Sequence, residues 1–271
     1  MNGDPIALAQ IAVAALGDIA FAATLGAMLL DRWARAESSL APIAAVVLVL
    51  CNVASLWLLA MEMSGASFVD AGASLRLVVM ATHAGTGWAV ALLGSVILLL
   101  TAKRAGLTPM LIVALIAAAG KSAIGHAADA GTFSIAEAVQ MVHLLATGVW
   151  GGVVIAGAMV LPQTGAQFMR VLHNVSRTAM IAVAFVLATG LYNAIRGTGG
   201  ALSVLASSTW GHALDVKLVL VALALAIGAW NRWIVMPHGA PQKVIRLMQI
   251  EALAIIGVFI AASVLSHSMP G

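Results

Sequence analysis

The chain has 271 residues, of which 62% are hydrophobic and 8% are charged. Its mean hydropathy of +1.07 excludes a soluble globular domain and indicates a polytopic membrane protein. The net charge of +3 comes from Lys and Arg residues that stand singly or in pairs at the ends of apolar segments, a pattern typical of membrane topology and not of nucleic-acid binding.

Eight apolar runs are long enough, at about 20 residues each, to cross a hydrocarbon core about 30 Å thick. Each run is predicted to be a helix, because an open strand would leave backbone groups unpaired in lipid. We therefore expect an all-α polytopic protein with a single transmembrane domain over residues 1–271. The runs are Ile6–Leu30, Leu40–Met61, Leu77–Leu100, Thr108–Ile124, Ile135–Leu161, Leu172–Ile195, Trp210–Met236 and Ile245–Leu265.

Lys and Arg are distributed unevenly between the two ends of these runs. The connections after the first, third, fifth and seventh runs carry more of them, and the positive-inside rule places those connections in the cytoplasm. Both termini are then expected outside. The expected cytoplasmic set is Arg32, Arg35, Lys103, Arg104, Arg170, Arg232, Lys243 and Arg246, and the expected outward set is Arg76, Lys121 and Arg196.

Short similarities indicate an internal duplication. LGAMLL at the end of the first run resembles AGAMVL at the end of the fifth, and SAIGH at the end of the fourth resembles SVLSH at the end of the eighth. Two halves in the same orientation, 1–130 and 131–271, would form a parallel repeat of four helices each, as in some transporters. His126 and His267 would then occupy equivalent outward positions.

The fifth run contains a histidine at membrane depth. The S-x-x-E motif at residues 134–137 predicts a capping box at the start of this helix. His143 follows about 13 Å into the helix, below the membrane surface. Gln140, Thr147 and Trp150 share its helix face, which is expected to point into the bundle.

Several motifs in order identify a family resemblance. GHAA, HLLATGVWGG, SRTAMIAVAFVLATGLYNA and WGHALDVKLVLVALALAIGAWNRW are followed by Glu251 in the last run. This order resembles the copper resistance protein D (CopD) family of bacterial inner-membrane proteins. The resemblance covers Ser122 to Gly271 well, whereas the first half matches only in helix count and in Thr82, Gly85 and Trp88.

This resemblance implies an eight-helix protein of the bacterial inner membrane, with periplasmic termini, that moves copper from the periplasm inward. The chain departs from the family pattern at its end, where His267 and Met269 stand. We expect no appended copper-binding domain, so capture of copper from a periplasmic chaperone stays open. The family pattern is found at His126, His143, Trp150, Gly151, Gly152, Arg177, Gly190, Tyr192, Asn193, Lys217, Asn231, Arg232 and Glu251.

Imidazole and thioether groups near the outward ends also favour copper, as Cu(I) or Cu(II), because these ligands suit that metal. His83 is expected about two turns into the third helix, and two methionines flank Glu62 at the outward end of the second. Structural histidines and ordinary methionine packing are the alternatives. The predicted metal ligands are His126, His143, His83, His267, Met61 and Met63.

Three charges inside the apolar runs are expected to have partners, because an unpaired charge at that depth costs several kcal/mol. Asp18 and Lys217 are predicted to pair with each other. The pair would either fix helix register or, with Glu251, form a relay for protons or cations.

Two other functions remain open at this stage. His83 and His143 could hold a haem between facing helices, as in membrane cytochromes, or the chain could deliver copper without translocating it. No nucleophile, phosphate loop or HExxH motif predicts an enzyme, and the single cysteine, Cys51, excludes an internal disulfide. The expected partners are the lipid bilayer, a periplasmic copper chaperone and a second copy of the chain in a homodimer, but no nucleic acid.

Overall fold

The computed structural model describes residues 5–103, 106–124, 134–199 and 208–268. Every regular element in these ranges is helical, which confirms the all-α part of the predicted fold class. The long helices are α1 (Pro5–Ala34), α2 (Leu40–Ser64), α4 (His83–Thr101), α5 (Leu107–Ser122), α6 (Ile135–Val160), α7 (Phe168–Gly197), α9 (Thr209–Trp230) and α10 (Pro241–Ser266). The short ones are η1 (Ala71–Ser74), α3 (Leu75–Ala81), η3 (Leu161–Gln163), η4 (Gly165–Gln167), η5 (Asn231–Val235) and η6 (Met236–His238).

In the described residues, seven helices are long and apolar enough to cross a membrane. The exception among the long helices is α5, whose 16 residues span about 24 Å at the usual rise per residue, less than a typical hydrocarbon core. The protein is therefore a multi-pass helical membrane protein, and α5 stays a predicted eighth span.

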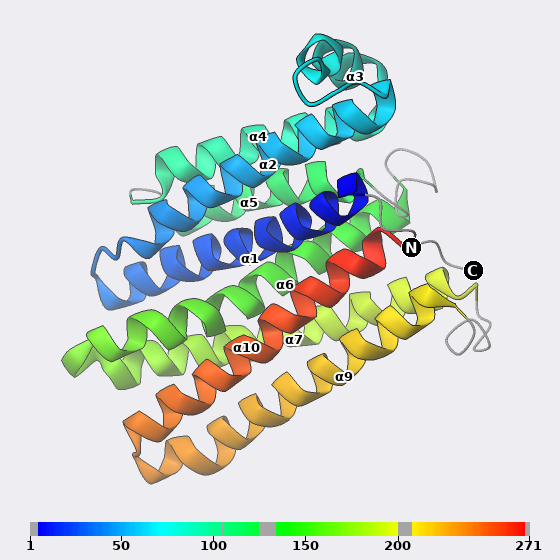
Figure 1. The fold of residues 1–271 in the computed structure, drawn as a ribbon. Helices are drawn as coiled ribbons and strands as arrows, with labels where there is room; N and C mark the ends of the chain where they lie inside the picture. Colours follow the sequence, from blue (N-terminus) through cyan, green and yellow to red (C-terminus); the bar gives the residue numbers. More distant parts are fainter. Residues whose placement is uncertain (1–4, 104–105, 125–133, 200–207, 269–271) are drawn as a thin grey trace.

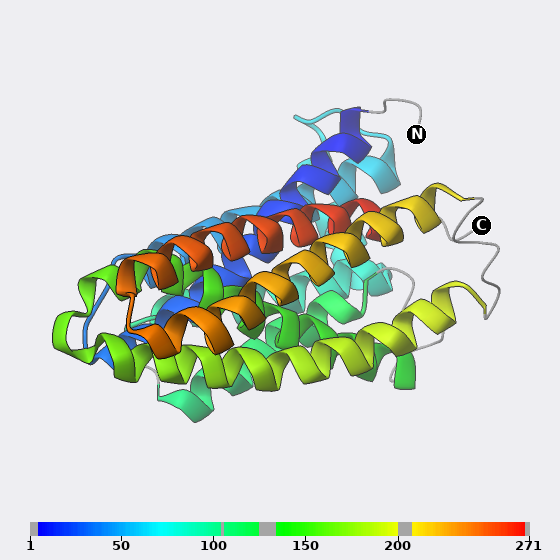
Figure 2. The ribbon, with the colours of Figure 1, turned by 90° about the horizontal axis from the view of Figure 1, so that it is seen from below.

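The long helices lie side by side along one axis, and α3 stands apart at one end (Figure 1). The start of α1 and the end of α10 lie at the same end of the bundle in both views (Figure 2). We call this end the outward end, following the predicted topology. The outside location of both termini and the internal duplication stay predictions.

Helix α6 lies at the centre of the bundle. It packs against α1, α5, α7 and α10, and 72% of its most apolar stretch is buried, the largest share of the seven spans. The closest approach is between α1 and α6, where the carbonyl of Gly152 occupies the place that a Cβ on Gly26 would need. Small residues permit such contact between membrane helices, so this crossing depends on both glycines.

The third apolar run, Leu77–Leu100, is not one continuous helix. The backbone of Thr82 is extended, with φ −124° and ψ 143°, and separates α3 from α4. The Thr82 hydroxyl accepts a hydrogen bond from the backbone N–H of Gly85 and so caps the new helix. The placement of His83 two turns inside a helix was therefore wrong, since His83 is the first residue of α4.

Candidate functional site

A cavity of about 760 Å³ lies in the outward end of the bundle. All eight long helices contribute residues to its wall. Its lining includes ionisable groups that are far apart in the sequence. These are Asp18 of α1, Cys51 and Glu62 of α2, Lys121 of α5, His143 of α6, Arg196 of α7, Lys217 of α9 and His267, which follows α10.

His143 is buried, with 8% of its surface exposed, and lines this cavity. Its Nδ1 lies 2.9 Å from the hydroxyl of Thr189 in α7. That hydroxyl donates its own hydrogen to the carbonyl of Phe185, 2.5 Å away, so it accepts from an Nδ1–H. The arrangement selects the tautomer in which Nε2 carries the free lone pair, and Nε2 is the nitrogen that remains for a ligand.

His267 lines the same cavity from the residue after α10. Its Nδ1 lies 2.8 Å from the carbonyl oxygen of Ser263, which can only accept a hydrogen. Nδ1 is therefore the protonated nitrogen, and Nε2 is again left for a ligand. A second ring nitrogen held by a backbone oxygen is the usual arrangement of a metal-binding histidine.

The charges in the cavity wall do not pair as predicted. Asp18 forms an ion pair with Lys121 of α5 and not with Lys217. Lys121, which the sequence counted on the outward side, lies in the last turn of α5 and reaches the cavity. Lys217 lies in the same wall and interacts electrostatically with both Asp18 and His143.

The predicted inward face of α6 is confirmed. Gln140 and Thr147 line the cavity beside His143, and Trp150 is 2% exposed in the core. The side-chain oxygen of Gln140 accepts a hydrogen bond of 2.8 Å from Asn193 of α7. The hydroxyl of Thr147 is buried and has no hydrogen-bond partner in the described part of the chain, so a polar group remains available in this wall.

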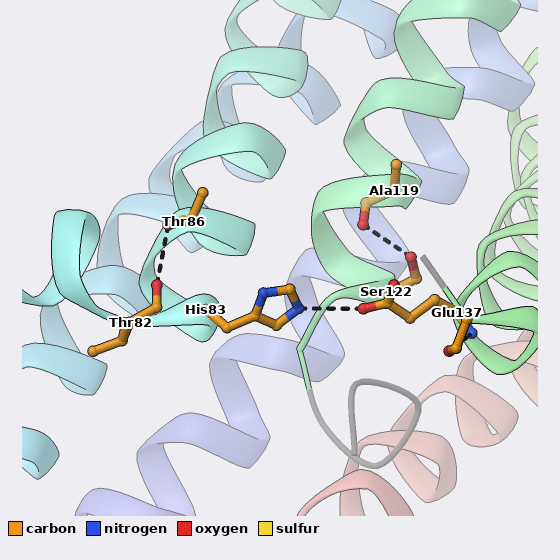
Figure 3. A network of polar contacts seen from close by, with 7 residues as sticks. Thr82, His83, Thr86, Ala119, Ser122 and Glu137 are labelled. Carbon is orange, nitrogen blue, oxygen red and sulfur yellow. Dashed lines mark hydrogen bonds and ion pairs between the residues drawn. The ribbon is translucent and has the colours of Figure 1, made fainter. Parts of the chain in front are cut away.

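His83 lies outside the cavity. Its Nε2 is 3.2 Å from Oε1 of Glu137 in the first turn of α6 (Figure 3). The His83 side chain is 43% exposed, whereas the Glu137 side chain is 11% exposed. This position separates His83 from His143, so the geometry gives no support to a haem held between these two histidines.

The remaining predicted ligands have different surroundings. Glu62 lines the cavity and accepts a hydrogen bond of 2.7 Å from Gln10, but neither flanking methionine is in the wall. Met61 packs against a small apolar cluster around α3, and Met63 is exposed. His126 falls outside the described residues.

No group of three or more His, Cys, Asp or Glu side chains within the four described ranges is close enough to hold a metal ion. A copper site in this cavity therefore uses two imidazoles at most from these ranges, with further ligands from elsewhere in the chain or from solvent. Imidazole remains a suitable donor for copper in either oxidation state.

Glu251 of α10 lies outside this cavity, beyond Phe259 toward the opposite end of the bundle. It is 6% exposed, and its carboxylate fills the space left by Gly228 of α9, where a Cβ would lie 2.8 Å from Oε1. It has no hydrogen-bond or ion-pair partner among the residues that the structure describes. A carboxyl group in this position is a candidate relay group.

Comparison with known proteins places the chain among membrane copper proteins. Residues 169–265 match the family "Copper resistance protein D", and residues 5–135 match "Copper resistance protein D-like, N-terminal domain". The chain belongs to the copper resistance protein D family. It is 28% identical over 209 residues to "Copper resistance protein D" of Pseudomonas syringae pv. tomato, covering 71% of this chain and 67% of that protein. No solved structure matches it.

The N-terminal match corrects one expectation from the sequence. Residues 5–135 resemble the copper resistance protein D family as a whole segment, and not only in helix count and three residues. This half supplies Asp18 and Lys121 to the cavity, so both matched regions contribute to its wall.

Sequence reasoning missed Lys121 and Thr189 as parts of the site. A signal for Thr189 was present, because the segment LATG occurs at residues 145–148 and again at residues 187–190. Gly190, in the second copy, lies beside the ring of His143, where a Cβ would be 3.4 Å from Cε1. For Lys121 no such signal exists, since a lysine at a helix end is ordinarily solvated.

Proposed function

We propose that this member of the copper resistance protein D family binds copper in the outward cavity and moves it across the bacterial inner membrane, from the periplasm to the cytoplasm. One observation carries the proposal: His143 and His267 line the same cavity, and each has its Nδ1 held by a protein oxygen. Two preoriented Nε2 atoms can then bind a copper ion without first losing a hydrogen bond.

The outer residues of the proposed site would act before the ion reaches the cavity. Met61 and Met63 flank Glu62, which lines the cavity, and the thioether is a ligand that suits Cu(I). His83 is partly exposed at the same end. We assign to these residues, together with His126, the capture of copper from solution or from a periplasmic chaperone.

The charged residues would compensate for the charge of the ion. Copper in the cavity is attracted by the carboxylate of Asp18 and repelled by the ammonium groups of Lys121 and Lys217. Entry of the ion is therefore expected to displace Lys121 from Asp18 or to release a proton from Lys217. Glu251 would accept a proton or the cation farther along the bundle.

The packing below the cavity favours a second candidate, a copper-delivery protein that does not translocate the ion. Trp150 is fully packed, and α1 and α6 are in backbone contact at Gly26 and Gly152. Translocation requires this region to open. A delivery protein would bind copper at the outward cavity and release it on the same side.

Copper content and uptake of three single variants test the proposal. His143→Ala and His267→Ala should each lose bound copper and uptake into sealed proteoliposomes. His173→Ala, which removes an exposed histidine at the other end of the bundle, is the matched control and should behave as wild type. Wild-type copper content in both cavity variants would refute the site, whereas bound copper without uptake in the parent protein would favour the delivery function.

A further inference from the structure

A groove of about 720 Å³ lies at the end of the bundle opposite the copper cavity, between the end of α9 and the start of α10. Its polar part consists of His238, Lys243 and Arg246, and its apolar part includes Trp230, Leu247 and Ile250. The groove shares no residue with the outward cavity. The proposed copper function does not use any of its side chains.

The local backbone shapes this groove. At Asn231 the α-helix changes to a π-helix, which runs to Val235 and is followed by the 3-10 turn Met236–His238. Gly239, with φ +62°, reverses the chain into α10. The side-chain amide of Asn231 donates to the carbonyl of Val244 and ties this turn to α10. The connection is thereby held beside the first two turns of α10 (Figure 1).

The basic side chains of the groove are not neutralised by the protein. Lys243 and Arg246 are exposed, and the described residues provide neither of them with an ion-pair partner. His238 binds the carbonyl of Ile234 through Nδ1 at 2.5 Å, which leaves Nε2 available. Arg232, the other cation of this turn, is instead engaged with Ser176 of α7. The groove therefore presents a positive surface with no carboxylate in its wall.

An apolar surface adjoins these cations. Lys243, Arg246, Leu247 and Ile250 follow one face of α10, so the lining changes from basic to apolar along the helix, away from its start. Ile250 is 45% exposed, and Trp230 is 59% exposed. Exposed tryptophan beside apolar side chains is typical of the boundary between lipid headgroups and acyl chains.

We propose that this groove binds an anionic phospholipid. The phosphate of the headgroup would contact Lys243, Arg246 and His238, and an acyl chain would lie along Leu247 and Ile250. A basic pocket between membrane helices near the interface suits such a headgroup. The order of basic and apolar residues along one helix matches the two parts of a single lipid, which an acidic peptide or a free phosphate would not require.

Native mass spectrometry of the purified full-length protein can test this assignment with phosphatidylglycerol and phosphatidylcholine as probes. The wild type should retain phosphatidylglycerol in preference to phosphatidylcholine. Lys243→Gln/Arg246→Gln should weaken retention of phosphatidylglycerol about 30-fold, because each basic residue near a lipid surface contributes about a fivefold factor. Arg32→Gln/Lys103→Gln removes two cations at the same end but outside the groove, and should leave retention unchanged.

Three outcomes would overturn the proposal. The first is equal retention of the two lipids by the wild type. The second is an equal loss of phosphatidylglycerol retention in the groove variant and the control variant. The third is displacement of the lipid by millimolar inorganic phosphate, which would indicate a phosphate site. If the groove variant does not fold, Lys243→Arg/Arg246→Lys should fold and retain the lipid preference. Loss of preference in this conservative variant also contradicts the assignment.

Discussion

The carboxylate of Asp18 in α1 pairs with the ammonium group of Lys121 in α5 across the wall of the outward cavity. The two side chains are 17% and 27% exposed, so water reaches them only in part. A charge at this depth requires a partner. The pair therefore links the first helix to the shortest of the long helices and places two opposite charges beside the proposed copper ligands.

Removal of one member of this pair should destabilise the protein. Lys121→Met leaves the Asp18 carboxylate without its partner, and an unsatisfied group of this kind costs about 1–3 kcal/mol of unfolding free energy. Asp18→Asn/Lys121→Met should recover part of that loss, because neither charge remains. Thermal unfolding in detergent measures both effects. Lys103→Met, at an exposed position, is the control, and an equal loss there would show that the pair contributes nothing specific.

Thr189 should affect copper binding through His143 and not through direct contact. Thr189→Val keeps the shape of the side chain but removes the oxygen that accepts from Nδ1, so the ring can rotate and change tautomer. Loss of such a supporting group lowers metal affinity about 10–100-fold. Thr189→Ser retains the oxygen and should restore most of the affinity. Copper titration of the purified variants decides the matter, and an unchanged affinity in Thr189→Val would contradict the assigned tautomer.

The crossing of α1 and α6 should not tolerate a larger residue. Gly152→Ala places a methyl group against the backbone carbonyl of Ala22, and overpacking of this kind costs about 1–3 kcal/mol. Gly257→Ala is the matched control, because its Cβ would meet only the side chain of Leu220 at 3.2 Å. The midpoint temperature of unfolding should fall in the first variant and change little in the second. Similar midpoints would mean that the two helices can separate without cost.

Glu251 should affect translocation but not binding in the outward cavity. Glu251→Gln preserves the shape of the side chain beside Gly228 and removes its ability to exchange a proton. Uptake into proteoliposomes should fall about tenfold, which is a barrier increase of about 1.4 kcal/mol, while the copper content stays at the wild-type value. Glu37→Gln, at an exposed position between α1 and α2, controls for a general charge effect. Normal uptake in Glu251→Gln would remove this residue from the relay.

The sequence predicted the long helices well, because a helix that crosses a bilayer needs an apolar run of a certain length. Apolar runs of spanning length determine the long helices, and the predicted ranges agree with them to within a few residues at most ends. The break at Thr82 was not predictable from hydropathy, because a threonine and a histidine fit within an apolar helix. It depends on the hydroxyl that caps α4 and on Gly85, which leaves room for the carbonyl of Val78.

The sequence predicted several of the histidines and charged residues that line the cavity. It did not predict which charged residues form an ion pair. His143 lies on the inward face of its helix, as periodicity indicates, and His267 reaches the same cavity. Asp18 forms its ion pair with Lys121, and Lys217, the partner expected from the sequence, interacts with it electrostatically without forming an ion pair. Helix order in the sequence does not specify which helices become neighbours. Packing brings α5 beside α6 and presents Lys121 to Asp18.

The sequence by itself determined that this chain is a membrane protein, that it is helical and that it resembles the copper resistance protein D family. These properties follow from composition and from short motifs, which are local. Only the tertiary structure decided which polar groups share the outward cavity, which nitrogen of each histidine is left for a ligand, and which cations line the groove between α9 and α10. Those relationships join residues on different helices, and they arise from side-chain packing between helices that no pattern along a single helix encodes.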